Sequence, residues 1–110
     1  MIESILTSVK KPLGIHEEST DFDADIIMHI NSVFMILRQM GVGPEEGFSI
    51  TDASAVWNDY VGESTDIESV KTYVFMKVKL IFDPPASSVI VEAMKQIISE
   101  LEWRLNVESS

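Results

Sequence analysis

The chain has 110 residues, of which 45% are hydrophobic and none is cysteine. These values are typical of one globular domain (residues 1–110) with the cytosol as its default compartment. The apolar content excludes a mainly disordered chain, and the absence of cysteine excludes a disulfide framework, a thiolate zinc site and a cysteine nucleophile. The 18 acidic and 8 basic residues give a net charge of −10, which excludes nucleic-acid binding by phosphate neutralisation, because that mode requires clustered Lys and Arg.

The N-terminal half of the chain has two segments with helical periodicity. The first runs from about Ile2 to Lys11, and Pro12 and Gly14 end it. Its apolar residues form one stripe: Ile2, Ile5, Leu6, Val9 and Leu13. The second begins with the acidic capping segment Thr20–Asp23 and ends at Gly41, which is placed as the left-handed C′ residue. Its stripe contains Ile26, Ile27, Ile30, Val33, Phe34, Leu37 and Met40.

A loop from Gly41 to Thr51 follows, and it is longer than most connections between helices. We therefore interpret its central part as a candidate mobile loop for a partner: Gly43, Pro44, Glu45, Glu46, Gly47 and Phe48. A short third helix is predicted from Ala53 to Val61, with Asp52 as its cap and Gly62 as its stop. Val56, Trp57 and Tyr60 lie on one side of it.

The fourth predicted helix, Ile67 to Phe82 with Asp66 as its cap, is apolar on more than one side. Either it is the central helix of a bundle or a second subunit covers part of it, and the two interpretations are compatible. The sequence Asp83-Pro84-Pro85 then breaks the chain.

A fifth helix is predicted from Ser87 or Ser88 to about Leu105. Its expected inward stripe is Ile90, Met94, Ile97, Ile98, Leu101 and Leu105. The pattern as a whole predicts an all-α fold, a compact bundle of about five helices.

The acidic residues do not form a convincing metal site. Asp21, Asp23 and Asp25 have the spacing of a calcium loop, but Ile26 replaces its glycine and Ser32 its final glutamate, so helix capping is the better interpretation. The pairs Glu18/Asp21 and Glu63/Asp66 have a spacing similar to that of helical magnesium-dependent nucleotide hydrolases, yet both lie in linkers.

Other catalytic signatures are absent from the sequence. His16 and His29 have no second histidine at metal spacing, and no nucleophile motif or phosphate-binding glycine loop is present. We expect no enzyme activity, no catalytic or metal-binding residues and no cofactor. No apolar stretch has the length of a transmembrane helix. Glu3 lies near the N-terminus and Lys10 and Lys11 follow the apolar residues, which is the wrong order for a signal peptide, so no membrane partner is expected.

Large aromatic residues are the other candidates for contacts, since Trp and Tyr are enriched at binding hot spots. For Trp57 and Tyr73 core packing is the better interpretation, whereas Trp103 lies off the inward stripe of the last helix. The candidate subunit or partner interface comprises Tyr73, Phe82, Asp83, Pro84, Pro85, Trp103 and Arg104.

Several stretches in order resemble one known family. They are Ile5-Leu6 to Leu13-Gly14-Ile15, Ile26-Ile27 through Ile30-Asn31 to Gln39-x-Gly41-Val42-Gly43, Trp57, Tyr73-Val74-x-x-Lys77-Val78 to Phe82-Asp83-Pro84-Pro85, and Glu102-x-Arg104-Leu105-Asn106. Together they span nearly the whole chain. The sequence resembles the small helical head–tail connector, or adaptor, proteins of long-tailed bacteriophages and prophages.

The resemblance implies a structural subunit that assembles as a ring, usually twelve-fold, beneath the portal protein of the filled head. Such a ring extends the DNA exit channel, lets DNA pass without specific binding, and presents a platform to the stopper or tail-completion protein. It implies a place at the head–tail interface of the virion, with assembly in the bacterial host cytoplasm, and no catalytic residues.

Two alternatives come from other classes of protein. One is an acidic DNA mimic that inhibits a DNA-processing enzyme, which requires carboxylates spaced along one exposed face. The other is the magnesium-dependent hydrolase, which requires metal-dependent turnover through residues such as Glu63 and Asp66.

Overall fold

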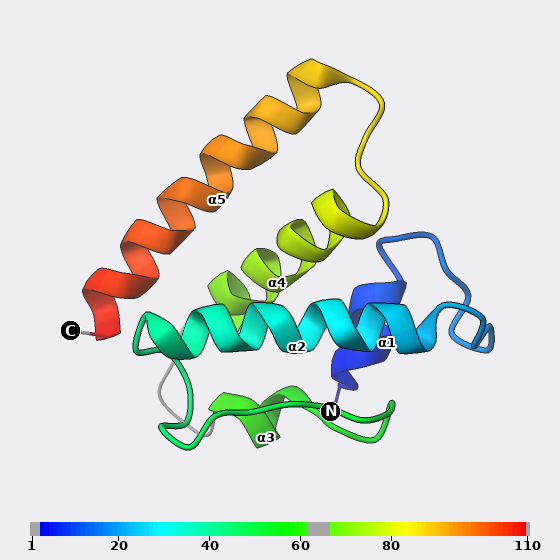
Figure 1. Cartoon of the computed structure of the whole chain (residues 1–110), viewed down its shortest axis with the longest axis horizontal. Coiled ribbons are helices and arrows are strands. Elements are labelled where there is room, and N and C mark those ends of the chain that lie inside the picture. Colours follow the sequence, from blue (N-terminus) through cyan, green and yellow to red (C-terminus); the bar gives the residue numbers. More distant parts are fainter. Residues whose placement is uncertain (1–2, 62–66, 110) are drawn as a thin grey trace.

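The computed structural model describes residues 3–61 and 67–109. In these two ranges the chain forms five helices and no strand, with one isolated antiparallel bridge between Ser4 and Val56 (Figure 1). The helices are α1 (Ile5–Lys10), α2 (Asp23–Gln39), α3 (Trp57–Val61), α4 (Ile67–Phe82) and α5 (Ser88–Ser109). The predicted all-α fold is confirmed.

Helix α2 lies at the centre of the arrangement, with α1 and α4 packed against it (Figure 1). Its buried residues fall on one side, as the 3.6-residue period predicts: Ile26, Ile30, Val33, Phe34 and Leu37. The helix ends in a Schellman motif, because the Gly41 amide donates to the carbonyl of Arg38 and the Val42 amide to that of Leu37, both at 2.9 Å. Gly41 has φ 87°, which confirms its predicted left-handed conformation.

Helix α1 is shorter than the predicted segment from Ile2 to Lys11. Ser4 caps it by accepting a hydrogen bond from the Thr7 amide at 3.2 Å, and Ile2 lies outside the described residues. The predicted apolar stripe is otherwise confirmed, since Ile5, Leu6, Val9 and Leu13 are all buried. A helix of six residues does not persist alone in water, so α1 depends on this packing.

Helix α3 begins at Trp57, four residues later than predicted. The Ile5 amide donates to the carbonyl of Ala55 at 3.0 Å, and the Trp57 amide donates to the carbonyl of Glu3 at 3.2 Å. These bonds hold Ala55 and Val56 beside the start of α1, and residues 51–54 form a bend and a turn, so the helix begins only at Trp57.

The predicted cap of α3 is also wrong. Asp52 accepts hydrogen bonds from the backbone and the hydroxyl of Ser54 within a local turn. Asp59 caps the start of α3 in place of Asp52. Its carboxylate accepts a hydrogen bond from the Val56 amide at 3.1 Å, which is one half of a capping box. The predicted stop at Gly62 and the predicted cap Asp66 of α4 lie outside the described residues.

A buried ion pair joins the end of α1 to the start of α2. The Lys10 side chain is 2% exposed, and its ammonium lies 2.8 Å from the carboxylate of Asp23. It also donates to the carbonyls of Glu17 at 3.1 Å and Ser19 at 2.6 Å. Asp23 therefore fixes the connection between two helices. Asp23 and Asp25 lie in the first turn of α2, in agreement with the predicted acidic start, but Phe22 occupies the N-cap and makes no side-chain cap bond.

Helix α4 lies between α2 and α5 and buries Val70, Tyr73, Val74 and Val78. Helix α4 is therefore packed on two sides by its own chain, although Ile81 near its end stays 54% exposed. Helix α5 begins where predicted, since the Ser87 hydroxyl accepts from the Ile90 amide at 3.3 Å.

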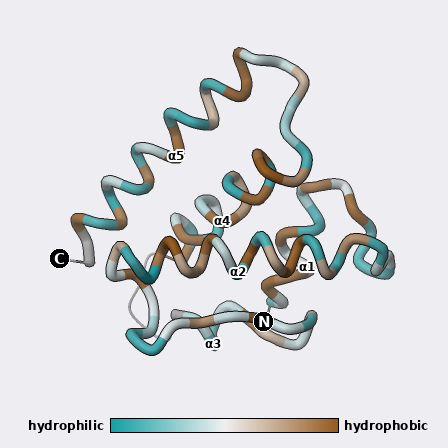
Figure 2. The backbone as a smooth tube through the Cα atoms, in the orientation of Figure 1, coloured by the Kyte–Doolittle hydropathy of each residue, from teal (hydrophilic) through white to brown (hydrophobic). Residues whose placement is uncertain are grey.

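The predicted inward stripe of α5 is only partly inward. Ile98 and Leu105 are buried, and Met94 and Leu101 are partly buried, but Ile90 is 52% and Ile97 is 41% exposed. Apolar positions recur along the whole of α5 in Figure 2, yet α4 is its main neighbour and covers one flank. The other flank of the stripe therefore remains open.

We predict that Lys10→Ala lowers the free energy of unfolding by about 3 kcal/mol, the lower end for a broken buried pair, because it leaves the buried Oδ1 atom of the partly buried Asp23 without its cation. Urea titration followed by circular dichroism measures this change. Replacement of both partners, Lys10→Met with Asp23→Leu, should recover most of the loss.

The control for this measurement is Lys11→Ala, since Lys11 is exposed and adjacent in sequence. Equal destabilisation by the Lys10 and Lys11 variants would contradict a structural role for the buried pair.

Candidate interaction surfaces

The residues predicted as an interface separate into two surface patches and one buried residue. Tyr73 is fully buried, and its hydroxyl donates to Glu102 of α5 at 2.8 Å. Burial is the main reason that the pKa of Tyr73 is raised well above its ordinary value, and the hydrogen bond to Glu102 adds to it. This ring holds α4 to α5, so it has no surface for a partner.

The first patch lies where α4 ends. Phe82 is partly buried and packs edge-on against the ring of Phe22, with centroids 5.5 Å apart. Asp83 is exposed and pairs with Lys79 of the preceding turn at 3.1 Å. Pro84 is exposed and Pro85 partly so.

The second patch lies near the C-terminal end of α5, at the other end of the α4–α5 pair (Figure 1). Trp103 is 68% exposed there, and the Arg104 guanidinium forms an ion pair with Glu100 at 2.8 Å. The exposed indole agrees with its predicted place off the inward stripe. The two patches therefore do not form one continuous site.

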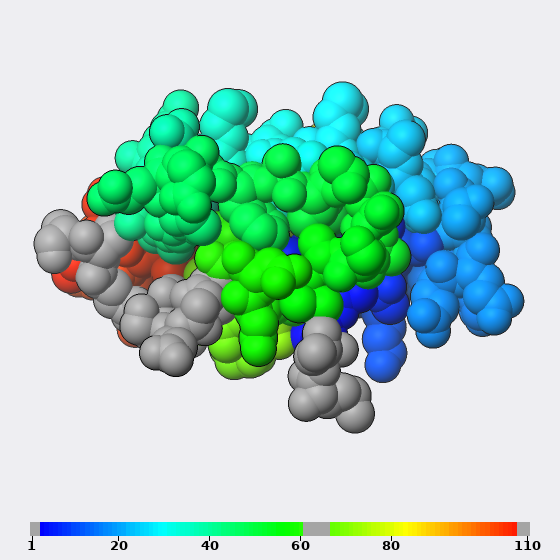
Figure 3. Space-filling model, turned by 90° about the horizontal axis from the view of Figure 1, so that it is seen from below, coloured from blue at the N-terminus to red at the C-terminus, as the bar shows by residue number. Residues whose placement is uncertain are grey.

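The predicted partner loop contacts α2 through two of its residues, Glu45 and Phe48. The Arg38 guanidinium donates to the carbonyl of Glu45 at 2.9 Å, and the ring of Phe48 packs edge-on against Phe34 and Tyr60 at 5.2 Å each. In Figure 3, residues 41–61 (green) occupy the centre of this face beside the cyan atoms of α2. The exposed tip, Glu45 and Glu46, remains available to a partner.

Two further contacts shape this loop. The amide side chain of Asn31 forms a pair of hydrogen bonds with the backbone of Ile50, at 2.8 and 3.0 Å. Gly43 has φ 89°, and a Cβ at this position would lie 2.7 Å from the ring of Tyr60. Glycine is thus required by both the backbone conformation and the close approach of the ring.

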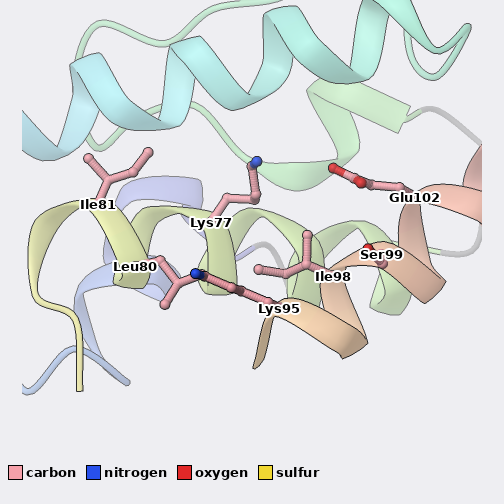
Figure 4. A pocket seen from close by; sticks show the side chains of 7 residues that line it. All are labelled: Lys77, Leu80, Ile81, Lys95, Ile98, Ser99 and Glu102. Carbon is pink, nitrogen blue, oxygen red and sulfur yellow. The ribbon is translucent and has the colours of Figure 1, made fainter. Parts of the chain in front are cut away.

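A groove that the sequence did not predict runs between α4 and α5, with a volume of about 310 Å³ (Figure 4). Ile98 and the stem of Lys95 extend from α5 toward α4, where Leu80 and Ile81 form the facing wall. The only signal in the sequence was the extra apolar surface of the fourth helix. It could not locate a groove, because the position of α5 depends on tertiary packing.

The carboxylates and histidines of the described residues do not gather into a group of potential metal ligands. Within residues 3–61 and 67–109, no three or more His, Asp or Glu side chains are placed to hold a metal ion together. Glu63 and Asp66, the second carboxylate pair, lie outside these ranges. In the same part of the chain, every helix is too short or too polar to span a bilayer.

Fold and surfaces together describe an all-helical chain that exposes several large apolar side chains. Residues 5–110 match the model of a protein family described as phage connector protein. The chain belongs to this family, which confirms the resemblance seen in the sequence, and its role is that of a structural phage connector and virion component. No curated protein and no solved structure matched the chain.

We predict a loss of stability at alkaline pH from the aromatic cluster beneath the loop. Burial raises the pKa of Tyr60 from its ordinary value of 10.0 to about 12. The unfolded chain therefore loses this proton first as the pH rises. Stability due to the buried neutral phenol is complete below pH 10 and is lost as the pH rises to about 12.

Urea unfolding at a series of pH values checks this prediction. Tyr60→Phe should make the decline between pH 10 and 12 shallower without abolishing it, because Tyr73 contributes a loss of the same sign. A variant with an unchanged decline would contradict the role of Tyr60.

Proposed function

We propose that this chain is the subunit of a homo-oligomeric ring that lies beneath the portal, joins the DNA-filled head to the tail and extends the DNA exit channel. One observation carries the proposal: Ile90 and Ile97, which belong to the apolar stripe of α5, are exposed in a chain that belongs to a connector family. A ring supplies neighbouring subunits that bury such surface.

In this proposal the portal contacts one face of the ring and the stopper or tail-completion protein the other. The ring is twelve-fold in the virion, and the subunits assemble in the cytoplasm of the bacterial host. The 110 residues act as one domain without catalytic activity or cofactor. The first patch, the second patch and the acidic tip of the loop are the candidate contacts for these neighbours.

The net charge of −10 suits a channel through which DNA must move. Duplex DNA carries one negative charge per about 1.7 Å, and carboxylates in a channel wall repel it over roughly the Debye length, about 8 Å at physiological salt. DNA therefore meets no site that holds it by its phosphates.

The same charge opposes ring closure, and from this we predict the salt dependence of assembly. The net negative charges of neighbouring subunits repel one another, and salt screens this repulsion. We expect monomers or weak oligomers at low ionic strength, and rings at high ionic strength or on a portal template.

Sedimentation velocity at both ionic strengths, with electron microscopy of the protein alone and with portal, measures this assembly. Tighter association at low salt would contradict the electrostatic account. A protein that never forms a ring, even with portal, and instead binds a DNA-processing enzyme would replace the connector proposal with the DNA-mimic alternative.

A further inference from the structure

The groove between α4 and α5 combines an apolar floor with two lysines and one carboxylate, that of Glu102, which accepts a hydrogen bond from the Tyr73 hydroxyl. Leu80, Ile81 and Ile98 supply the apolar surface, and Lys77 and Lys95 lie beside it (Figure 4). Within the described ranges no carboxylate forms an ion pair with Lys77, whose ammonium lies 6.0 Å from the ring centroid of Tyr73. Lys95 has only a long contact of 3.8 Å with Glu92.

Cations are scarce in this chain, so their position is informative. Of the 8 basic residues, Lys10, Lys71, Lys79 and Arg104 pair with carboxylates at 2.7 to 3.1 Å, Arg38 donates to the carbonyl of Glu45, and Lys11 is exposed. Lys77 has no ion pair among the described residues and Lys95 has only the exposed Glu92 at 3.8 Å, so the groove, with two lysines and one carboxylate, is positive in a molecule of net charge −10. An occupant with apolar side chains and a carboxylate is the best match.

The outer side of α2 has these properties. Five exposed residues form a straight ridge along it, at positions that face away from the buried stripe: Asp25, Met28, Ser32, Met35 and Gln39. Met28 and Met35 are each 57% exposed, and methionine adapts well to an irregular apolar surface. The carboxylate of Asp25 forms no ion pair with any described residue.

The ridge and the groove also agree in length and position. Met28 and Met35 are seven residues apart, as are Lys95 and Glu102 along the groove, so each spans about 10 Å of helix. Because α4 packs against α2 on one side and α5 on another, the ridge of a subunit points away from its own groove. One molecule therefore cannot join the two.

We propose that the ridge of one copy of this chain, along the outer side of α2, lies in the α4–α5 groove of the next copy. Asp25 then approaches the lysines of the groove, and Met28 and Met35 cover its apolar floor. Two different faces meet in this contact, so it is heterologous, and a repeated heterologous contact closes a ring when its rotation permits. This inference rests on the proposed ring and specifies which faces of the subunits meet.

Cysteine cross-linking tests the contact, because the chain has no cysteine of its own. Ser32→Cys places a thiol on the ridge and Ser99→Cys places one at the groove; both positions are exposed, so the fold should tolerate them. The two single variants are mixed under ring-forming conditions, with portal if it is required, and treated with a short bifunctional maleimide. We expect covalent dimers in the mixture and their loss when either variant is treated alone.

The matched control replaces the ridge cysteine with Asn58→Cys, an exposed position on α3, which should give no dimer with Ser99→Cys. Rings without cross-linked dimers in the Ser32→Cys and Ser99→Cys mixture would overturn this contact and leave the proposed function intact. Coupling of Ser99→Cys to portal or tail protein in place of a second copy would also overturn it. Absence of any ring would overturn both proposals.

Discussion

A helix with one main neighbour can bury only one flank, and α5 is in this position. Its 22 residues pack chiefly against α4, so Ile90 and Ile97 stay exposed although their spacing belongs to the apolar stripe. Each buried Ile contributes roughly 1.5–3 kcal/mol relative to an exposed one, and this stabilisation is not realised within the single chain. Because assembly can recover it, the proposed ring follows from this incomplete packing.

The other helices and the loop are joined by specific polar contacts and support α4 and α5. The buried pair of Lys10 and Asp23 fixes the connection from α1 to α2, and the hydrogen bonds between Asn31 and Ile50 hold the loop beneath α2. Tyr73 joins α4 to α5 through Glu102. These contacts therefore hold α2 and the C-terminal half of α5 in fixed places, as an interface requires.

Periodicity and capping predicted the five helices, the end of α2 at Gly41 and the start of α5 at Ser87, because these features depend on residues near in sequence. The start of α3 could not be predicted, since it depends on hydrogen bonds between residues 3–5 and 55–57. A helical-wheel projection of the sequence could have revealed the ridge, because Met28 and Met35 interrupt the polar side of α2. The groove required the position of α5, which no local pattern contains.

Hydrogen–deuterium exchange of the isolated subunit and of the assembled ring tests most directly whether assembly completes the packing of α5. The account predicts that amides 88–98 exchange faster than the core of α2 in the isolated subunit, because few tertiary contacts protect them. It predicts that assembly slows them by about tenfold or more, equivalent to about 1.4 kcal/mol. Equal protection of α5 and α2 in the isolated subunit, unchanged by assembly, would contradict the account.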